Sequence, residues 1–224
     1  MQFMNLKMFL ALLVIVLAVA AVFYFKPWNK NVADDLKAPG LLMENKTEEK
    51  NMSETETKNP QVAVKTNMGD IVLELYMDKT PITAGNFLKL VKEGFYDGTK
   101  FHRVINEFMI QGGDPESKGN DTSLYGRGGP GYTIQDEFVD GLSNIRGTIS
   151  MANTGQPDSG GSQFFINLVD NTGLDFDKPP LTSSHPVFGR VLAGMDIVDA
   201  IAKTATGPGD IPINPVIIEK ILIQ

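Results

Sequence analysis

The stretch FHRVINEFMIQGGD at residues 101–114 decides the fold of this chain. Its apolar residues fall into two short runs, 101–105 and 108–112, which a polar turn separates. This pattern predicts two adjacent antiparallel strands, in which the side chains of alternate residues share one face of a sheet. Arg103 lies within the first run, although arginine is rarely buried unless it is paired. The stretch therefore predicts a sheet that carries a cation on a largely apolar face.

The sequence around this stretch predicts mainly β structure. Apolar residues alternate on both sides of a turn at 67–70, a pattern typical of a β-hairpin. One helix is expected to begin at Pro81 and end at Gly94, and a second helix is expected at 194–202. Many short strands, glycine turns and only two helices predict a closed antiparallel β-barrel. The remaining strands are expected at 147–151, 163–168, 187–191 and 216–223.

The amino-terminal segment has a different character. Residues 8–25 are 18 consecutive apolar residues, flanked by Lys7 and Lys26. As a helix they would rise about 27 Å, close to the ~30 Å thickness of the hydrocarbon core of a bilayer. After a short tail, residues 1–7, this run favours one uncleaved transmembrane helix. A signal peptide cleaved near Ala20 is the alternative, in which case the protein is secreted.

The rest of the chain divides into a linker and a domain. Residues 26–60 are polar and of mixed charge, so they are expected to form a flexible linker. Residues 61–224 are expected to form the folded domain. A short tail ahead of a single apolar segment usually stays in the cytoplasm. We therefore expect a single-pass protein of the cell membrane whose domain is extracytoplasmic.

Composition excludes several classes of site. The chain has no cysteine, which excludes disulfides, thiol nucleophiles and cysteine-ligated zinc. The two histidines, His102 and His185, are too few for most metal sites. The net charge of −7 arises in residues 61–224, which hold 13 Lys and Arg against 20 Asp and Glu, unlike a nucleic-acid-binding domain. No metal, cofactor or nucleic acid is expected, and an acidic domain on a long tether suggests a monomer.

Two glycine-rich motifs raise other functions. The segment PDSGGS at 157–162 suggests a serine hydrolase in which Ser159 would act with His102 and Asp136. A glycine turn capped by polar side chains explains the same residues equally well. The segment GRGGPG at 126–131 is not followed by Lys-Ser or Lys-Thr, so it is interpreted as a glycine loop and not a phosphate-binding loop.

Polar side chains recur among apolar or glycine neighbours at Asn153, Gln163 and His185, as they do at Arg103. Together with their flanks, these residues make the chain resemble the cyclophilins, the cyclophilin-type peptidyl-prolyl cis-trans isomerases. The matching blocks come in the family's order and span almost all of the expected domain. They are FHRV at 101–104, FMIQGGD at 108–114, YTIQDEF at 132–138, GTISMAN at 147–153, GSQFFI at 161–166 and VFGRV at 187–191.

The resemblance implies an eight-stranded closed barrel with two capping helices, and it implies roles for individual residues. Arg103 matches the family's catalytic arginine. The residues that match the pocket for the substrate proline are Phe108, Met109, Phe165 and Leu174. Those that match amides holding the substrate or orienting the arginine are Gln111, Asn153 and Gln163. Further groove positions are matched by His102, Ala152 and His185.

The chain departs from the family's pattern at three places. Asn106-Glu107 replaces a Pro-Gly-like turn, which is expected to be harmless. Gly173 falls where several members have a tryptophan that contacts the inhibitor cyclosporin, so weak cyclosporin binding is expected. The loop at 176–186 is longer than in short members, which bears on the equivalence of His185.

The resemblance implies isomerisation of X–Pro bonds, and the location implies exported or cell-surface proteins as substrates. The X–Pro bond interconverts slowly, and its transition state has a pyramidal nitrogen that a guanidinium can stabilise. This chemistry needs no nucleophile, metal or cofactor. A proline-peptide binding or chaperone module with incidental turnover would use the same groove and is the open alternative.

Overall fold

The structure is a computed structural model that describes residues 59–179 and 183–224. The predicted tail, anchor and nearly all of the linker, residues 1–58, lie outside the described residues. Within the described ranges, no helix has both the length and the apolar character needed to cross a bilayer. The folded domain predicted at 61–224 falls almost wholly within these ranges.

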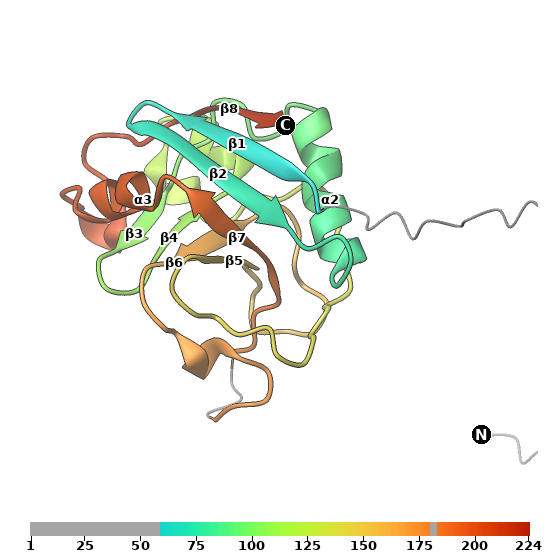
Figure 1. Cartoon of the computed structure of the whole chain (residues 1–224). Helices are drawn as coiled ribbons and strands as arrows, with labels where there is room; N and C mark the ends of the chain where they lie inside the picture. The colour runs from blue at the N-terminus through green and yellow to red at the C-terminus, as the bar shows by residue number, and fades with distance from the viewer. Residues whose placement is uncertain (1–58, 180–182) are drawn as a thin grey trace, which may run out of the picture. The chain divides into compact units, whose positions relative to one another are not determined.

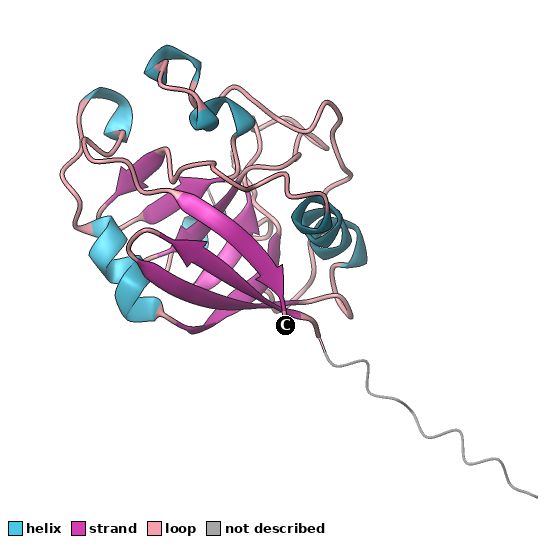
Figure 2. Ribbon diagram, turned by 90° about the horizontal axis from the view of Figure 1, so that it is seen from above, coloured by secondary structure: helices cyan, strands magenta, loops and turns pink. Residues whose placement is uncertain are grey.

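The domain is built on one antiparallel sheet of eight strands in the order β3-β4-β6-β5-β7-β2-β1-β8. Two α-helices lie on opposite sides of this curled sheet (Figures 1 and 2). The helices are α2 (Pro81–Lys92) and α3 (Met195–Ala202). The strands are β1 (Gln61–Thr66), β2 (Gly69–Leu75), β3 (Arg103–Ile105), β4 (Met109–Gly112), β5 (Thr148–Met151), β6 (Phe164–Asn167), β7 (Val187–Ala193) and β8 (Ile218–Ile223).

The sheet is a half-barrel, and the prediction of a closed barrel is wrong. β3 and β8 stand at the two ends of the strand order and do not pair with each other. The chain just before β3 instead bonds to the start of β8, where Gly98 N donates to Ile218 O at 2.8 Å and Ile218 N donates to Thr99 O at 2.8 Å. Phe101 N also donates to Val216 O at 2.9 Å, and Lys100 pairs with Ile217 in an isolated bridge. Residues 98–101 nevertheless form no strand, so β3 and β8 are not joined into one continuous ladder.

Residues 101–112 form the predicted hairpin. β3 pairs with β4 through Arg103 with Gln111 and Ile105 with Met109. The turn between them holds Glu107 at a φ of 60°, in the left-handed region that a non-glycine residue seldom adopts. The unusual Asn106-Glu107 turn is therefore compatible with strand pairing, as predicted.

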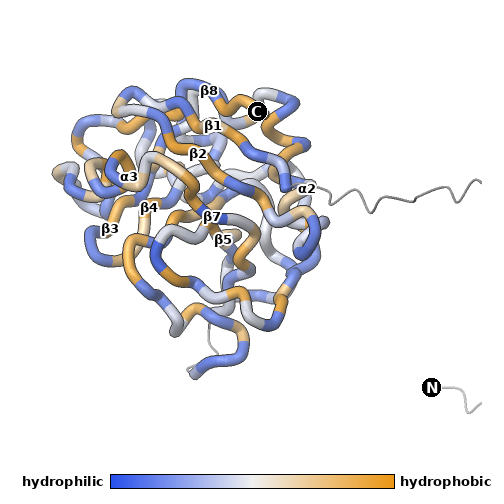
Figure 3. The backbone as a smooth tube through the Cα atoms, viewed as in Figure 1, coloured by the Kyte–Doolittle hydropathy of each residue, from blue (hydrophilic) through white to orange (hydrophobic). Residues whose placement is uncertain are grey.

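The core is a cluster of aromatic rings that ties α2 to the sheet. Phe87 of α2 is fully buried, and its ring centroid lies 4.9 Å from that of Tyr96, 5.4 Å from Phe164 and 5.5 Å from Phe188. Burial of each such side chain contributes roughly 1.5–3 kcal/mol to folding. Figure 3 shows hydrophobic stretches along the strands and hydrophilic stretches on many of the surrounding loops.

A loop carboxylate fixes the amino terminus of α2. Pro81 occupies the first turn, as predicted, but Thr80 makes no side-chain cap. Instead, Ile82 N and Thr83 N donate to the carboxylate oxygens of Glu137 at 3.0 and 2.5 Å. A carboxylate accepts hydrogen bonds from the free N–H groups of the first turn, and its negative charge is stabilised by the positive end of the helix dipole. This contact fastens the loop that carries Glu137 to the rigid body of the domain.

Candidate active site

Strand register brings three of the predicted site residues into one row. Arg103 on β3 is the cross-strand partner of Gln111 on β4, and Gln111 is the partner of Phe165 on β6. Directly opposed residues on neighbouring strands project to the same face, about 5 Å apart. A cation, an amide and an aromatic ring therefore stand side by side across three strands.

This row borders a groove of about 470 Å³. The groove gathers side chains from β3, β4 and β6, from the chain that follows β5, and from the loop that precedes β7. Its lining residues are Arg103, Phe108, Met109, Gln111, Ala152, Asn153, Thr154, Gly155, Phe165, Leu174, Ser183 and His185. Nine of the predicted site residues are among these twelve.

The apolar base of the groove is rigid, whereas its cation is accessible. Met109 and Phe165 are 2% and 4% exposed, so their side chains are held by the core. The side chain of Arg103 is 43% exposed. Its Nε lies 3.4 Å from Oδ2 of Asp210, and within residues 59–179 and 183–224 its two Nη atoms make no hydrogen bond. The Nη groups are thus available to a ligand in the groove.

A chain of amides links the groove to an adjoining cavity. Gln111 Nε2 donates to Gln163 Oε1 at 2.9 Å, and Gln163 Nε2 donates to the carbonyl of Gly128 at 2.8 Å. Gln163 lines the adjoining cavity of about 240 Å³, which shares Gln111, Ala152 and Asn153 with the groove. Gln163 therefore orients Gln111 from behind, and it does not line the main groove.

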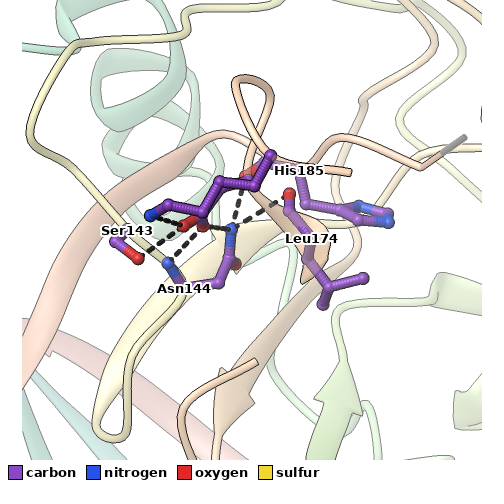
Figure 4. A network of polar contacts seen from close by, with 6 residues as sticks. Ser143, Asn144, Leu174 and His185 are labelled. Atoms are coloured by element: carbon purple, nitrogen blue, oxygen red, sulfur yellow. Dashed lines mark hydrogen bonds and ion pairs between the residues drawn. The ribbon is translucent and has the colours of Figure 1, made fainter. Parts of the chain in front are cut away.

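The wall formed by Leu174 and His185 is fixed from outside the groove. Asn144 Nδ2 donates to the carbonyls of Leu174 at 3.2 Å and His185 at 3.1 Å (Figure 4). Asn144 also donates from its backbone N and its Nδ2 to Oδ1 of Asp175, at 2.7 and 3.0 Å. Oδ2 of Asp175 accepts from Ser143 Oγ at 2.6 Å. These contacts hold both ends of the 174–185 loop against one segment.

His185 faces the groove in its neutral form. Burial lowers the pKa of this imidazole, although its hydrogen bond to the Met151 carbonyl acts in the opposite direction. Nδ1 lies 3.1 Å from that carbonyl oxygen, which can only accept, so Nδ1 carries the proton. Nε2 then accepts from Ser183 Oγ at 2.7 Å. The ring also packs edge-on against Phe165, with centroids 5.2 Å apart.

Comparisons with known proteins identify this arrangement. Residues 61–223 match the family described as cyclophilin type peptidyl-prolyl cis-trans isomerase/CLD. The chain belongs to this family. It is 45% identical to peptidyl-prolyl cis-trans isomerase B of Escherichia coli, over 73% of this chain and 99% of that protein. It is 44% identical to a peptidyl-prolyl cis-trans isomerase of Acinetobacter baylyi, over 74% of this chain and 86% of that protein.

A solved structure agrees with the sequence relatives. The cyclophilin-type isomerase of Cryptosporidium parvum, crystallised in the presence of the dipeptide Ala-Pro, matches with a TM-score of 0.63 and 32% identity. The match covers 73% of this chain and 98% of that one. The chain is thus a peptidyl-prolyl cis-trans isomerase. Because this one domain covers 86–99% of these relatives, we expect residues 59–224 to fold on their own.

Within this cyclophilin, His102 lies outside the groove. It is 3% exposed and lines a separate cavity of about 140 Å³ together with Lys100 and Tyr125. Neither ring nitrogen has a hydrogen-bond partner within the described residues. Burial lowers the pKa of the imidazole, against the opposing effect of the Asp114 carboxylate, so the ring is neutral. The groove position expected for His102 from the resemblance is not where the structure places it.

The serine hydrolase alternative is wrong. Ser159 Oγ donates to the carbonyl of Gln156 at 2.6 Å and accepts from Thr154 N at 3.1 Å. It has no contact with His102, whose ring nitrogens are unpartnered. Asp136 exchanges hydrogen bonds with Asp158 and not with a histidine. Ser159 therefore closes a turn, as the simpler interpretation of PDSGGS predicted.

The groove contains residues that the sequence analysis missed. Thr154 and Gly155 directly follow Asn153, so extending the GTISMAN block by two residues would have found them. Ser183 comes from the 176–186 loop, where the resemblance gave no guide. Asp210, the partner of Arg103, is 107 residues away along the chain, and no local pattern marks it. No cluster of three or more metal-ligating side chains occurs within the described ranges.

Proposed function

We propose that this cyclophilin isomerises X–Pro bonds of exported or cell-surface polypeptides outside the cytoplasm, with Arg103 as its catalytic residue. The observation that carries the proposal is the position of Arg103. Its guanidinium borders the groove, and its Nη groups make no hydrogen bond within the described residues. A proline ring seated in the groove would bring its amide nitrogen to these donors.

The chemistry follows from the electronic structure of the amide. Rotation about the peptide bond meets a barrier of ~18–20 kcal/mol because resonance is lost in the twisted state. In that state the proline nitrogen becomes pyramidal and holds a localised lone pair. A guanidinium N–H directed at this nitrogen binds the twisted state more strongly than the planar ground state. Such differential binding accelerates the reaction.

The other groove residues hold the two sides of the bond. Met109, Phe165 and Leu174 supply apolar surface for the pyrrolidine ring. Gln111 is oriented by Gln163, and Asn153 lies at the rim, so both amides can bond to the flanking peptide. With one side of the X–Pro bond fixed, rotation is confined to the other side. The step breaks no covalent bond, so it requires no nucleophile or base.

The apolar run at residues 8–25 supports this location. An uncleaved helix there, with its short tail in the cytoplasm, would place the domain outside the membrane on a polar tether. Unfolded chains emerging from export would then meet the groove near the membrane surface. An acidic domain of this kind is expected to act as a monomer.

The catalytic role is tested by comparing Arg103→Lys with the parent. Lysine keeps the charge but loses the planar fork of donors. We expect kcat to fall by about a hundredfold with little change in KM, since loss of one transition-state donor costs roughly 10²–10³ in rate. Unchanged kcat would overturn the role of Arg103. A parent that binds a proline peptide without accelerating its isomerisation would instead support the binding or chaperone alternative.

The location is tested with the full chain expressed in bacteria. We expect added protease to digest the domain in intact spheroplasts while the chain stays with the membrane fraction. Protection until lysis would contradict the extracytoplasmic orientation. Recovery of a shortened, soluble protein from the medium would replace the anchor with a cleaved signal peptide.

A further inference from the structure

Within residues 59–179 and 183–224, the only hydrogen-bond partner of the Arg103 side chain is a carboxylate from a distant loop. Asp210 Oδ2 lies 3.4 Å from Arg103 Nε, and the two side chains are 47% and 43% exposed. Exposed ion pairs contribute little to stability, because water screens them and both side chains lose rotamer freedom. Stability is therefore a poor explanation for this pair.

The loop is built so that its backbone presents Asp210. Gly207 N donates to Ile211 O at 2.8 Å, and Ile213 N donates to Ala205 O at 2.9 Å, which closes the loop at its base. At its tip, Gly209 and Asp210 have φ values of 75° and 60°. A left-handed conformation is costly for any residue with a Cβ and persists where the surroundings enforce it. Such strain concentrates at functional sites.

We propose that Asp210 is a positioning residue that aims the guanidinium of Arg103 at the substrate. A carboxylate on Nε restricts rotation of the guanidinium about the last bonds of the side chain. The four N–H bonds of the two Nη atoms stay free for the reacting amide. Without Asp210, Arg103 would sample several rotamers and spend less time directed into the groove. This inference rests on the proposed catalytic role of Arg103.

The kinetic test compares Asp210→Ala, Asp210→Asn and Asp210→Gly in residues 59–224. We expect Asp210→Ala to lower kcat by about tenfold with KM nearly unchanged, since misplacing a reacting group by ~1 Å can cost about a hundredfold. Asn retains an oxygen acceptor, so Asp210→Asn should recover part of the loss. Glycine tolerates the left-handed φ, so Asp210→Gly should lose kcat while the unfolding midpoint does not fall.

The matched control is Glu107→Gly. Glu107 also has a φ of 60° and carries the same charge, but it forms no ion pair within the described ranges. Its replacement should leave kcat within about twofold of the parent. An equal loss of kcat in Glu107→Gly and Asp210→Gly would mean that loss of a charge or of turn strain causes the effect, and it would overturn the proposal. Full kcat in Asp210→Ala would overturn it as well.

Two further measurements separate this proposal from the function it rests on. In an Arg103→Ala background, Asp210→Ala should cause no further loss of activity; an unchanged tenfold loss would contradict positioning through Arg103. Independently of activity, the Arg103 Nε–H resonance in ¹⁵N NMR should exchange with water several-fold faster in Asp210→Ala than in the parent. An inactive parent that still shows this change would refute catalysis by Arg103 while leaving the Arg103–Asp210 pairing established.

Discussion

Replacement of Asp175 by alanine should destabilise the groove wall more than the loss of any exposed contact would. The side chain of Asp175 is 1% exposed, and its carboxylate accepts from Ser143, from Asn144 and from Lys178. Burial alone would raise the pKa of this carboxyl, but these hydrogen bonds outweigh burial and lower it. The carboxylate is therefore charged at neutral pH, and both of its oxygens accept hydrogen bonds.

The size of the effect follows from which donors lose their partner. Asn144 is 1% exposed, and its backbone N would have no acceptor, a loss that costs about 1–3 kcal/mol. Asn144 Nδ2 would keep the carbonyls of Leu174 and His185. Lys178 is 47% exposed, so water replaces its contact at little cost. With the small cavity left behind, Asp175→Ala should destabilise the domain by about 3 kcal/mol.

Urea unfolding of residues 59–224 measures this loss, and peptide isomerisation measures its effect on the groove. Because Asn144 and Asp175 fix the loop that carries Leu174 and His185, we also expect KM to rise severalfold. The control is Asp170→Ala, which removes one exposed hydrogen bond to Arg146 N and should cost below about 1 kcal/mol. A loss below about 1 kcal/mol in Asp175→Ala, or equal losses in the two variants, would show that the buried carboxylate does not stabilise the groove wall.

Two further predictions concern pH and an inhibitor. Burial lowers the pKa of His102 and His185 below the ordinary 6.5. As the pH falls through 6.5, the unfolded chain therefore binds protons at these histidines before the folded chain does. Stability should therefore be nearly constant from about pH 7.5 to about pH 9 and should fall below about pH 7, by up to about 1.4 kcal/mol per pH unit for each histidine. Urea midpoints of His102→Asn should fall less steeply as the pH is lowered. A flat profile in the parent would contradict burial of neutral rings. A Cβ on Gly173 would meet nothing within 4 Å, so Gly173→Trp should be tolerated. Fluorescence titration should show that this variant binds cyclosporin about tenfold more tightly than the parent. Tight binding by the parent would contradict its expected weak binding.

Local patterns in the sequence predicted the elements because each depends on near neighbours. The hairpin of residues 101–112 and the helix that starts at Pro81 were confirmed with small changes of boundary. The closed barrel was wrong because closure depends on whether the segment before β3 is a strand. Its bonds to the start of β8 come from residues 98–101, which form a turn and a bridge. Such long-range register is not encoded in local alternation.

The candidate site likewise has a part that the sequence predicts and a part that depends on the tertiary fold. Family blocks predicted the groove positions of Arg103, Met109, Gln111 and Phe165, because these residues lie on paired strands with fixed register. They could not show that Gln163 stands behind Gln111, since that depends on how the Gly128 loop folds over the sheet. The pairing of Arg103 with Asp210 was equally hidden. It joins β3 to a loop 107 residues away and arises only from the tertiary fold.

We propose that Arg103 accelerates rotation of the X–Pro bond and does not merely help to bind the peptide. The most direct test measures cis/trans exchange of a short Ala-Pro peptide by NMR with residues 59–224 and with Arg103→Ala, alongside the affinity of each for the peptide. We predict that the parent accelerates exchange and that Arg103→Ala lowers the catalysed rate by about 10²–10³, with affinity changed only severalfold. A rate that survives the substitution, or that falls only in proportion to affinity, would contradict the claim.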